Sequence, residues 1–502
     1  MRIAFYKIMF ICITSFLMND VVAQTLESDL SRGSYLLLQK PFQIEAMGFP
    51  HRFDDQTNTT KKMQWDLETF KMSNYTSHLV SVWNLDWWPV GAGDLPWSKV
   101  EQADKEGFPI PLTATERSKF KNIVRVQWED DNLHPALPEM VEIAERWFKD
   151  RLANADYKDI VLSIDLPPYG YSSDQLDDML KALQPDLIMW NRYPQEWSQK
   201  LHLRQIEYGW YAMLVYNRDV AQGGNDRTGR KPVPHGAYTQ AFRNGYADAM
   251  PHSRMYYNHF LNLLFGAKYL STFLYTSWPV WNAEEHDIND RDPKLNPENA
   301  GLVSTLFNSK YPFQPTAEFY VQKEINRQVS NIGNALLRLQ TSGIRFVRGS
   351  NIEAVVQKMP FAGGIYDWDY GERPDPLLTK VSVTRPGFND TQDVWVGWFR
   401  PIHETIDGSG TKNENYFMVV NGCWDANDVS SEQVIKLEFD FGDDDTINSL
   451  LRISRLTGEI EIVPLINITE NRYCLDLVLN GGSGDLFKYN NGISFLGIEN
   501  NE

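Results

Sequence analysis

The sequence is poor in cysteine and has no excess of positive charge. Its 502 residues include 3 cysteines, Cys12, Cys423 and Cys474, too few for a disulfide-rich scaffold. The formal net charge is −18. Because clustered Lys and Arg are needed to bind phosphate backbones, we expect no nucleic-acid partner. An anionic membrane surface is disfavoured for the same reason.

Long apolar segments are also missing, apart from one near the N-terminus. Arg2 and Lys7 accompany the apolar stretch Ile8–Met18, which is too short to span a bilayer, and the small residues Val21–Ala23 follow. This pattern predicts a signal peptide over residues 1–23, with a membrane anchor as the alternative. We therefore expect an exported protein, periplasmic, at the cell surface or secreted, with no transmembrane segment after the signal is removed.

Several catalytic and cofactor motifs are absent as well. The chain has no zinc-ligand spacing, no His-Glu-x-x-His, no glycine-rich phosphate loop and no Ser-His-Asp pattern at suitable positions. We therefore expect no metal and no cofactor. Export would permit Cys423 and Cys474 to form a disulfide, but two buried thiols are an equally good interpretation of their spacing.

An alternation of short apolar runs with amphipathic stretches extends from about residue 42 to residue 339. This alternation predicts β/α units around a parallel sheet. Eight runs are expected to be strands, which is the number in a (β/α)8 TIM barrel. They are residues 42–45, 78–83, 108–112, 123–128, 160–164, 187–190, 236–240 and 269–274. The third is the weakest because it contains prolines.

Beyond about residue 351 the pattern changes to strands separated by turn residues. Strands are expected at 394–398, 416–420, 435–439 and 474–479, which favours an antiparallel β-sandwich. The predicted fold is therefore of the α/β class, with a (β/α)8 barrel over residues 24–345 and a smaller antiparallel β-sandwich over 346–502.

The C-terminal ends of barrel strands are where such folds carry their active sites. The acidic triplet Glu129, Asp130 and Asp131 follows the fourth predicted strand. Glycoside hydrolysis needs one protonated carboxyl group and a second that acts as base or nucleophile. Repulsion among adjacent carboxylates raises the pKa of one of them, as a general acid requires. A calcium site that includes Asn132, or a solvated loop, is the alternative.

Aromatic residues are abundant, with 16 Trp and 23 Tyr. Their rings offer flat apolar faces that suit the C–H faces of sugars, although those near strand ends could instead seal the barrel against the second domain. Together with polar residues after the predicted strands, they make up the candidate substrate-binding set: Asn84, Trp87, Trp88, Asn191, Tyr193, Gln240, Tyr275, Trp278 and Trp281.

Several segments, in the same order and at similar spacing, resemble bacterial glycoside-hydrolase-like proteins with a clan A type TIM barrel and a C-terminal β-sandwich. The matching segments are Asp130–Asn132, Leu137–Met140, Pro185–Pro194, Gln240–Phe242, Phe265–Lys268, Tyr416–Asn421 and Arg455–Glu459. The resemblance implies this fold and a role in glycan processing. The chain departs from the family at its acids, since Asp131 stands where the family has Glu and Asn191 where it has Asp.

These observations predict a secreted glycoside hydrolase that acts on a polysaccharide or its oligosaccharides. Asp131 is the expected general acid, and Glu129 is the alternative because residues two apart on a strand point to the same side. The second carboxylate is left open among Glu45, Asp165 and Glu284. The competing hypothesis is a catalytically degenerate barrel that binds glycans without cleaving them.

Overall fold

The structure is a computed structural model of the whole chain. It describes residues 25–48, 60–80, 95–101, 122–128, 134–166, 171–194, 210–243, 251–276, 303–308, 314–350, 365–413, 415–423, 431–442 and 447–496. The predicted signal peptide, residues 1–23, lies outside this part of the chain.

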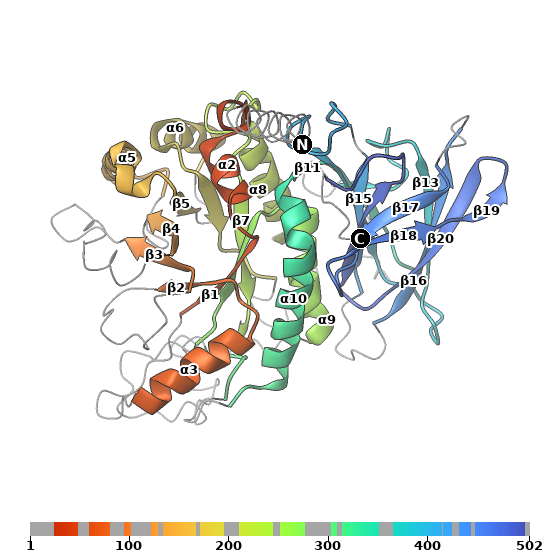
Figure 1. Cartoon of the computed structure of the whole chain (residues 1–502), viewed down its shortest axis with the longest axis horizontal. Coiled ribbons are helices and arrows are strands. Elements are labelled where there is room, and N and C mark those ends of the chain that lie inside the picture. Colours follow the sequence, from red (N-terminus) through yellow and green to blue (C-terminus); the bar gives the residue numbers. More distant parts are fainter. Residues whose placement is uncertain are drawn as a thin grey trace, which may run out of the picture.

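Eight parallel strands close into a barrel in chain order, which confirms the predicted TIM-barrel fold (Figure 1). The last strand pairs with the first, so the sheet has no open edge. The strands are β1 (Gln43–Met47), β2 (Ser77–Val80), β3 (Trp97–Glu101), β4 (Ile123–Trp128), β5 (Val161–Leu166), β6 (Leu187–Trp190), β7 (His235–Gln240) and β9 (Tyr269–Phe273).

The third barrel strand is the one that was predicted at the wrong place. The structure forms β3 from Trp97–Glu101, whereas the predicted run at 108–112 lies outside the described residues. The segment Trp-Ser-Lys-Val-Glu contains two charged residues and therefore lacks the apolar run that marked the other strands. Its first two and last two residues are nevertheless buried: Ser98 contacts Tyr269 of β9, and Glu101 contacts Trp147 and Arg151.

Helices between the strands cover the outside of the barrel (Figure 1). In α6, Leu176, Met179, Leu180 and Leu183 are buried, as expected for one apolar face of a helix. Ser172 and Gln175 form a capping box at its N-terminus. The helices are α2 (Arg32–Leu38), α3 (Thr60–Met72), α5 (Pro138–Ala153), α6 (Ser173–Leu183), α8 (Ala212–Gly223), α9 (His252–Leu264) and α10 (Ala317–Leu337), with a 3-10 turn at Ala155–Tyr157 and a short pair of strands, β8 (Phe242–Arg243) and β10 (Val303–Ser304).

A β-sandwich follows the barrel, as predicted. All strand pairs in its two sheets are antiparallel except β11 with β12. In β16, inward-facing Ile435, Leu437 and Phe439 are buried and alternate with half-buried residues, the period of a strand with one covered face. One sheet contains β12 (Tyr366–Asp367), β11 (Leu339–Val347), β14 (Val394–Pro401), β15 (Tyr416–Asn421), β21 (Gly484–Tyr489), β17 (Ser449–Ile453) and β18 (Ile460–Pro464). The other contains β13 (Leu378–Thr384), β16 (Gln433–Asp440), β20 (Arg472–Leu479) and β19 (Ile466–Thr469).

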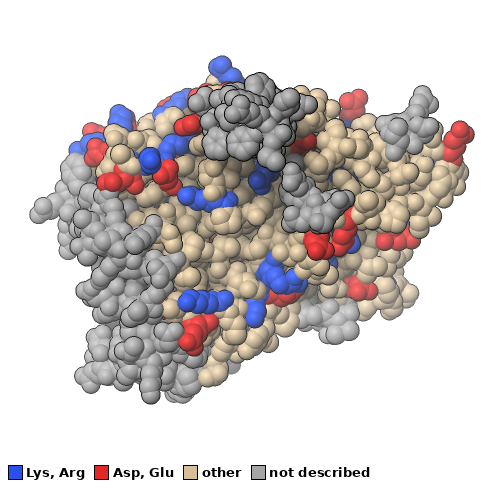
Figure 2. Space-filling view, in the orientation of Figure 1, with Lys and Arg blue, Asp and Glu red and all other residues tan. Residues whose placement is uncertain are grey.

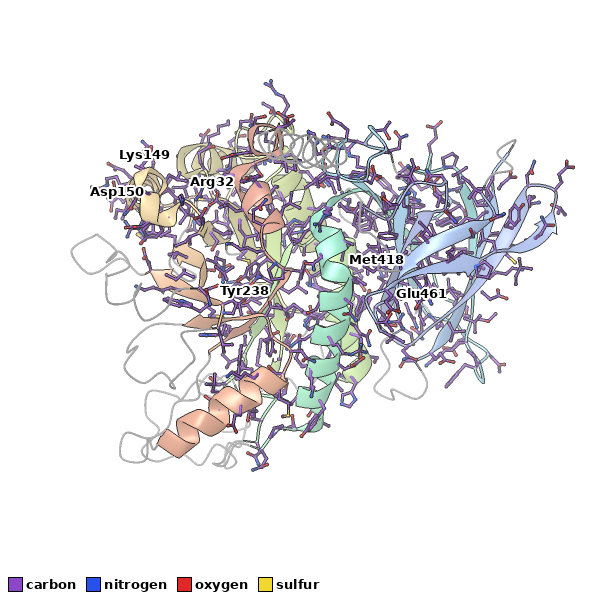
Figure 3. The ribbon with its side chains drawn as sticks, in the orientation of Figure 1. Arg32, Lys149, Asp150, Tyr238, Met418 and Glu461 are labelled. Carbon is purple, nitrogen blue, oxygen red and sulfur yellow. The ribbon has the colours of Figure 1, made fainter. Side chains whose placement is uncertain are left out.

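The sandwich packs directly on the barrel helices α9 and α10 (Figure 1). Met418 of β15 belongs to the same buried apolar cluster as the barrel core, and Figure 3 shows it where the two domains meet. The indole Nε1 of Trp395 donates a hydrogen bond of 2.8 Å to the Tyr257 hydroxyl of α9. Strand β11 starts two residues after α10 ends, so the predicted division at 345/346 falls within that strand.

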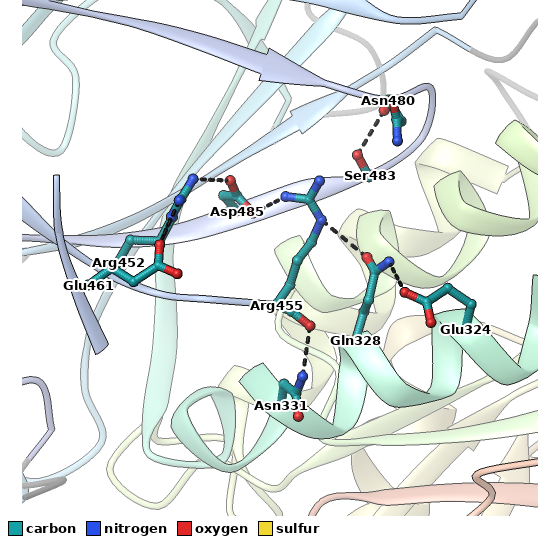
Figure 4. A network of polar contacts seen from close by, with 9 residues as sticks. All are labelled: Glu324, Gln328, Asn331, Arg452, Arg455, Glu461, Asn480, Ser483 and Asp485. Atoms are coloured by element: carbon teal, nitrogen blue, oxygen red, sulfur yellow. Dashed lines mark hydrogen bonds and ion pairs between the residues drawn. The ribbon is translucent and has the colours of Figure 1, made fainter. Parts of the chain in front are cut away.

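Polar contacts join the same two domains (Figure 4). Arg455 donates from Nε to Gln328 of α10 at 3.1 Å and also pairs with Asp485 of β21. The Asn331 amide of α10 donates to the Arg455 carbonyl at 2.8 Å. The barrel and the sandwich are therefore held together by both apolar packing and charge-assisted hydrogen bonds.

Cys423 and Cys474 are both buried, and they do not form a disulfide with each other. None of the helices in the described ranges has the length and apolarity needed to cross a bilayer. On the face drawn in Figure 2, basic and acidic side chains are interspersed without a large patch of either sign.

Candidate functional site

The candidate site lies at the C-terminal ends of the barrel strands. Several of its predicted residues lie outside the described residues, and the structure bears on the rest. Those outside are Asn84, Trp87, Trp88, Glu129, Asp131, Trp278, Trp281 and Glu284. Those described are Glu45, Asp165, Asn191, Tyr193, Gln240 and Tyr275.

A buried polar network occupies the middle of the barrel, and its central residue is Arg125 of β4. The guanidinium pairs with the Glu45 carboxylate of β1 at 2.6 Å and donates to Ser163 Oγ of β5 at 3.0 Å. It also donates to the Gln127 side chain, which in turn accepts a hydrogen bond of 2.9 Å from Tyr238. Figure 3 labels Tyr238 within the barrel.

Both carboxylate oxygens of Glu45 take part in this network. Besides Arg125, it accepts hydrogen bonds from the Tyr269 hydroxyl and, at 2.9 Å, from Ser271 Oγ, both on β9. Burial, followed by the Glu45 charge, raises the pKa of Tyr269 well above its ordinary value, so the phenol keeps its proton and remains a donor. A carboxylate that is charge-balanced and hydrogen-bonded in this way holds the barrel together and is poorly suited to exchange protons with a substrate.

Asp165 occupies the next level of the barrel toward the C-terminal end. It lies two residues beyond Ser163 on β5, so its side chain points to the same inner side, about 6.6 Å further along the strand. The residue is fully buried. Its charge contributes, after burial and the nearby Tyr216, to raising the pKa of Tyr171 above the ordinary range. Asp165 is therefore a buried carboxylate at the place where barrel enzymes hold their reacting groups.

Two further residues share that level. Gln240 is two residues beyond Tyr238 on β7, and Phe273 is two residues beyond Ser271 on β9, and the two are register partners. Gln240 is fully buried and its amide donates to the Phe242 carbonyl at 3.4 Å. The predicted position of Gln240 at this end of the barrel is thus where the structure has it.

Three aromatic rings gather at this end of the barrel. Tyr193, which follows β6, stacks on Phe273 with ring centroids 5.7 Å apart and an interplanar angle of 25°. Phe242 contacts both rings edge-on, at 5.0 Å from Tyr193 and 5.4 Å from Phe273. Tyr193 and Phe273 are only partly buried, as is Asn191 beside them. Phe242 and Phe273 were missed from sequence, although the strand alternation counted from Ser271 would have pointed Phe273 inward.

Tyr275, in contrast, packs in the core. Its ring is fully buried and contacts Phe70, Tyr75 and Phe307 edge-on, with centroids 5.1 to 5.9 Å away. Burial, followed by the charge of Asp66 on α3, raises the pKa of Tyr275 well above its ordinary value. The ring therefore offers no face to a ligand, which differs from its predicted role in sugar binding.

Within the described ranges, no three His, Cys, Asp or Glu side chains converge as a metal centre would require. The described part of the site thus consists of one buried carboxylate, one buried amide and an aromatic cluster. This composition suits a neutral, hydroxyl-rich ligand with apolar faces.

No protein-family model matches the chain, and no curated protein matches it. Among solved structures, it is similar to a β-glucuronidase of Bifidobacterium dentium, with 10% identity, a TM-score of 0.40 and coverage of 57% of this chain and 47% of that one. It is also similar to a β-galacturonidase of Eisenbergiella tayi, with 11% identity, a TM-score of 0.38 and coverage of 54% of this chain and 48% of that one. A β-galactosidase of Marinomonas has 8% identity and a TM-score of 0.36, with coverage of 59% of this chain and 62% of that one. The chain thus spans about half to three fifths of the length of these proteins, and its likeness to them is one of fold.

Proposed function

We propose that the protein is a secreted glycoside hydrolase that acts on a polysaccharide or its oligosaccharides by carboxylate acid/base catalysis. The observation that carries this proposal is the buried carboxylate of Asp165 at the C-terminal end of β5, at the same end of the barrel as the rings of Tyr193 and Phe273. The carboxylate supplies the chemistry, and the partly exposed rings supply stacking faces for a sugar.

Asp165 is preferred over Glu45 as the second carboxylate. Glu45 is held by Arg125, Tyr269 and Ser271 at the level below, so removing its charge would leave a buried guanidinium unbalanced. Asp165 lies one level nearer the strand ends, where a substrate would arrive.

The partner of Asp165 is expected to be Glu129 or Asp131. Glu129 directly follows Trp128, whose Cα pairs with that of Ile164, and Asp165 directly follows Ile164. Neighbouring strands lie about 4.8 Å apart. Retaining glycosidases hold their two carboxyl groups about 5 Å apart, and inverting ones about 6.5–9.5 Å apart. Glu129 or Asp131 would be the general acid, and Asp165 the base or nucleophile.

The test is turnover of a panel of polysaccharides and oligosaccharides, with reducing ends and mass-spectrometric products as readouts. Asp165→Asn should lower kcat by roughly a hundredfold or more, because general acid–base groups contribute that much. Whichever of Glu129→Gln and Asp131→Asn removes the general acid should lower kcat to a similar extent, and so should the double variant. Asp150→Asn, which removes an exposed carboxylate from α5, is the matched control and should leave turnover unchanged.

A wild-type rate in Asp165→Asn would remove Asp165 from the mechanism. Thermal unfolding of each variant distinguishes loss of chemistry from loss of fold, since Asp165 is fully buried.

A glycan-binding protein without hydrolytic activity is the second candidate. Asn191, at the end of β6, carries an amide where the family that the sequence resembles has a carboxylate, and an amide can bind a hydroxyl but cannot act as a base. This candidate predicts glycan affinity, lost on Tyr193→Ala, with no product from any member of the panel. Release of a defined sugar by the wild-type chain would rule it out.

A further inference from the structure

A cavity of about 190 Å³ lies at the opposite end of the barrel from Asp165. Its walls come from α2, α8, the start of β7, the turn before β9 and strand β11 of the sandwich, together with the end of β14 and the segment that follows it. His235, the first residue of β7, is part of the lining, whereas Asp165 lies near the last residue of its strand. The cavity is therefore separate from the proposed catalytic site and lies where the barrel meets the sandwich.

The lining of this cavity is mainly basic, whereas the chain as a whole is acidic. In a protein of net charge −18, it holds five Arg and Lys side chains and one carboxylate, Asp29. Burial lowers the pKa of one of the five, Lys268, to about 7. The Asp29 carboxylate lies 3.3 Å from the His403 ring nitrogen. The cationic side chains are Arg218, Arg230, Lys268, Arg400 and Lys412. A concave site lined by charges of one sign concentrates ions of the other sign.

Two of these cations have structural roles. Lys268 donates to the carbonyls of Leu336 and Leu339, which compensates the C-terminal end of α10. Arg218 pairs with Asp219 at 2.8 Å. Neither side chain requires a ligand to explain its position.

Arg400 has no such explanation. Its side chain is half-buried on β14, its Nε is fully buried, and it makes no hydrogen bond or ion pair with any residue that the structure describes. Leaving a buried guanidinium N–H without an acceptor costs free energy, so such groups normally face a water, an ion or a ligand. The planar guanidinium is suited to bidentate contact with carboxylate, phosphate or sulfate oxygens.

The remaining walls are apolar. Leu37 of α2, Val233 before β7 and Leu339 of β11 are all buried beside the cationic groups. Apolar walls lower the local dielectric constant and strengthen an ion pair formed between them. They also suit a compact organic body better than a fully hydrated inorganic ion.

We propose that this cavity binds a small organic oxyanion, with a carboxylate, phosphate or sulfate head at Arg400 and a compact body against the apolar walls. This proposal goes beyond the proposed hydrolase activity and does not rest on it. Because the lining comes from both domains, an occupant would connect the barrel to the sandwich and stabilise the folded chain.

The test is calorimetric binding and thermal unfolding of the mature chain at constant ionic strength. The probes are glucuronate, glucose 6-phosphate, inorganic phosphate and sulfate, with glucose and chloride as neutral and simple-ion references. We expect saturable binding of at least one organic anion and a rise in Tm, with no effect of glucose. Stronger binding of the inorganic ions than of the sugar anions would contradict the proposal that the ligand has an organic body.

Variants locate the site. Arg400→Gln should weaken the binding of the anion at least tenfold, and Lys412→Gln should weaken it by a smaller factor because that side chain is exposed. Arg472→Gln removes an equal charge from the exposed face of β20 and should leave the affinity unchanged. Equal affinity in wild type, Arg400→Gln and Lys412→Gln would overturn the proposal, as would the absence of any anion-dependent stabilisation. Lys412→Gln decides the question if Arg400→Gln does not fold.

Discussion

The ion pair between Glu45 and Arg125 provides the sharpest test of how the barrel interior is built. Both side chains have 0% of their surface exposed, and they lie 2.6 Å apart. Replacing Glu45 with Gln keeps the side-chain shape but removes the charge that balances the guanidinium. Breaking a buried pair from one side costs about 3–5 kcal/mol, which is a large part of the 5–15 kcal/mol that typically stabilises a domain.

The assay is urea unfolding, followed by tryptophan fluorescence, of the wild type, Glu45→Gln, Arg125→Gln and the double variant. Both single variants should be strongly destabilised. The double variant should lose at least about 2 kcal/mol less than the sum of the two, because no uncompensated charge is left. Glu145→Gln is the matched control: its partner Lys149 is 68% exposed, so we expect a loss of no more than about 0.5 kcal/mol.

Wild-type stability in Glu45→Gln would refute this reasoning. If such a variant also lost all turnover, Glu45 and not Asp165 would be the catalytic carboxylate. A loss of stability that is simply additive in the double variant would show that the two side chains act independently.

Three further predictions concern the rest of the structure. Burial lowers the pKa of His259 to about 4, below its unfolded value, so this residue should contribute a loss of stability of about 1.5 kcal/mol between pH 6.5 and pH 5; in urea titrations the pH-dependent loss of His259→Gln should be smaller than that of the wild type by this amount. Gly33→Ala should cost several kcal/mol in the same assay, because the added Cβ would lie 1.8 Å from the Asp186 carbonyl oxygen. Arg455→Met should lower the free energy of unfolding by about 1–3 kcal/mol through lost contacts with Asp485 and α10, and Arg455→Lys should recover part of that loss.

The sequence predicted the fold well because its signals are local. Short apolar runs located seven of the eight barrel strands. The failure at β3 has the same cause. Trp97–Glu101 carries two charged residues, and it is buried by side chains distant in the sequence, among them Trp147 and Tyr269.

The site was less predictable because strand-end acids look alike in sequence. Glu45 and Asp165 were equal candidates until closure of the barrel brought Arg125 of β4 across to Glu45 of β1. Tyr275 looked like a strand-end ring until α3 and the segment around Phe307 packed over it.

By itself, then, the sequence determined the order of the elements, the barrel-and-sandwich class and the end of the barrel at which Asp165 and Tyr193 lie. Only the tertiary structure decided which carboxylate is neutralised, which ring is buried and which cations surround a cavity. The physical reason is the distance along the chain over which each effect acts, because backbone periodicity acts over only a few residues. Charge pairing and burial depend on neighbours that are distant in the chain, as Leu37 and Arg400 are where they line one cavity.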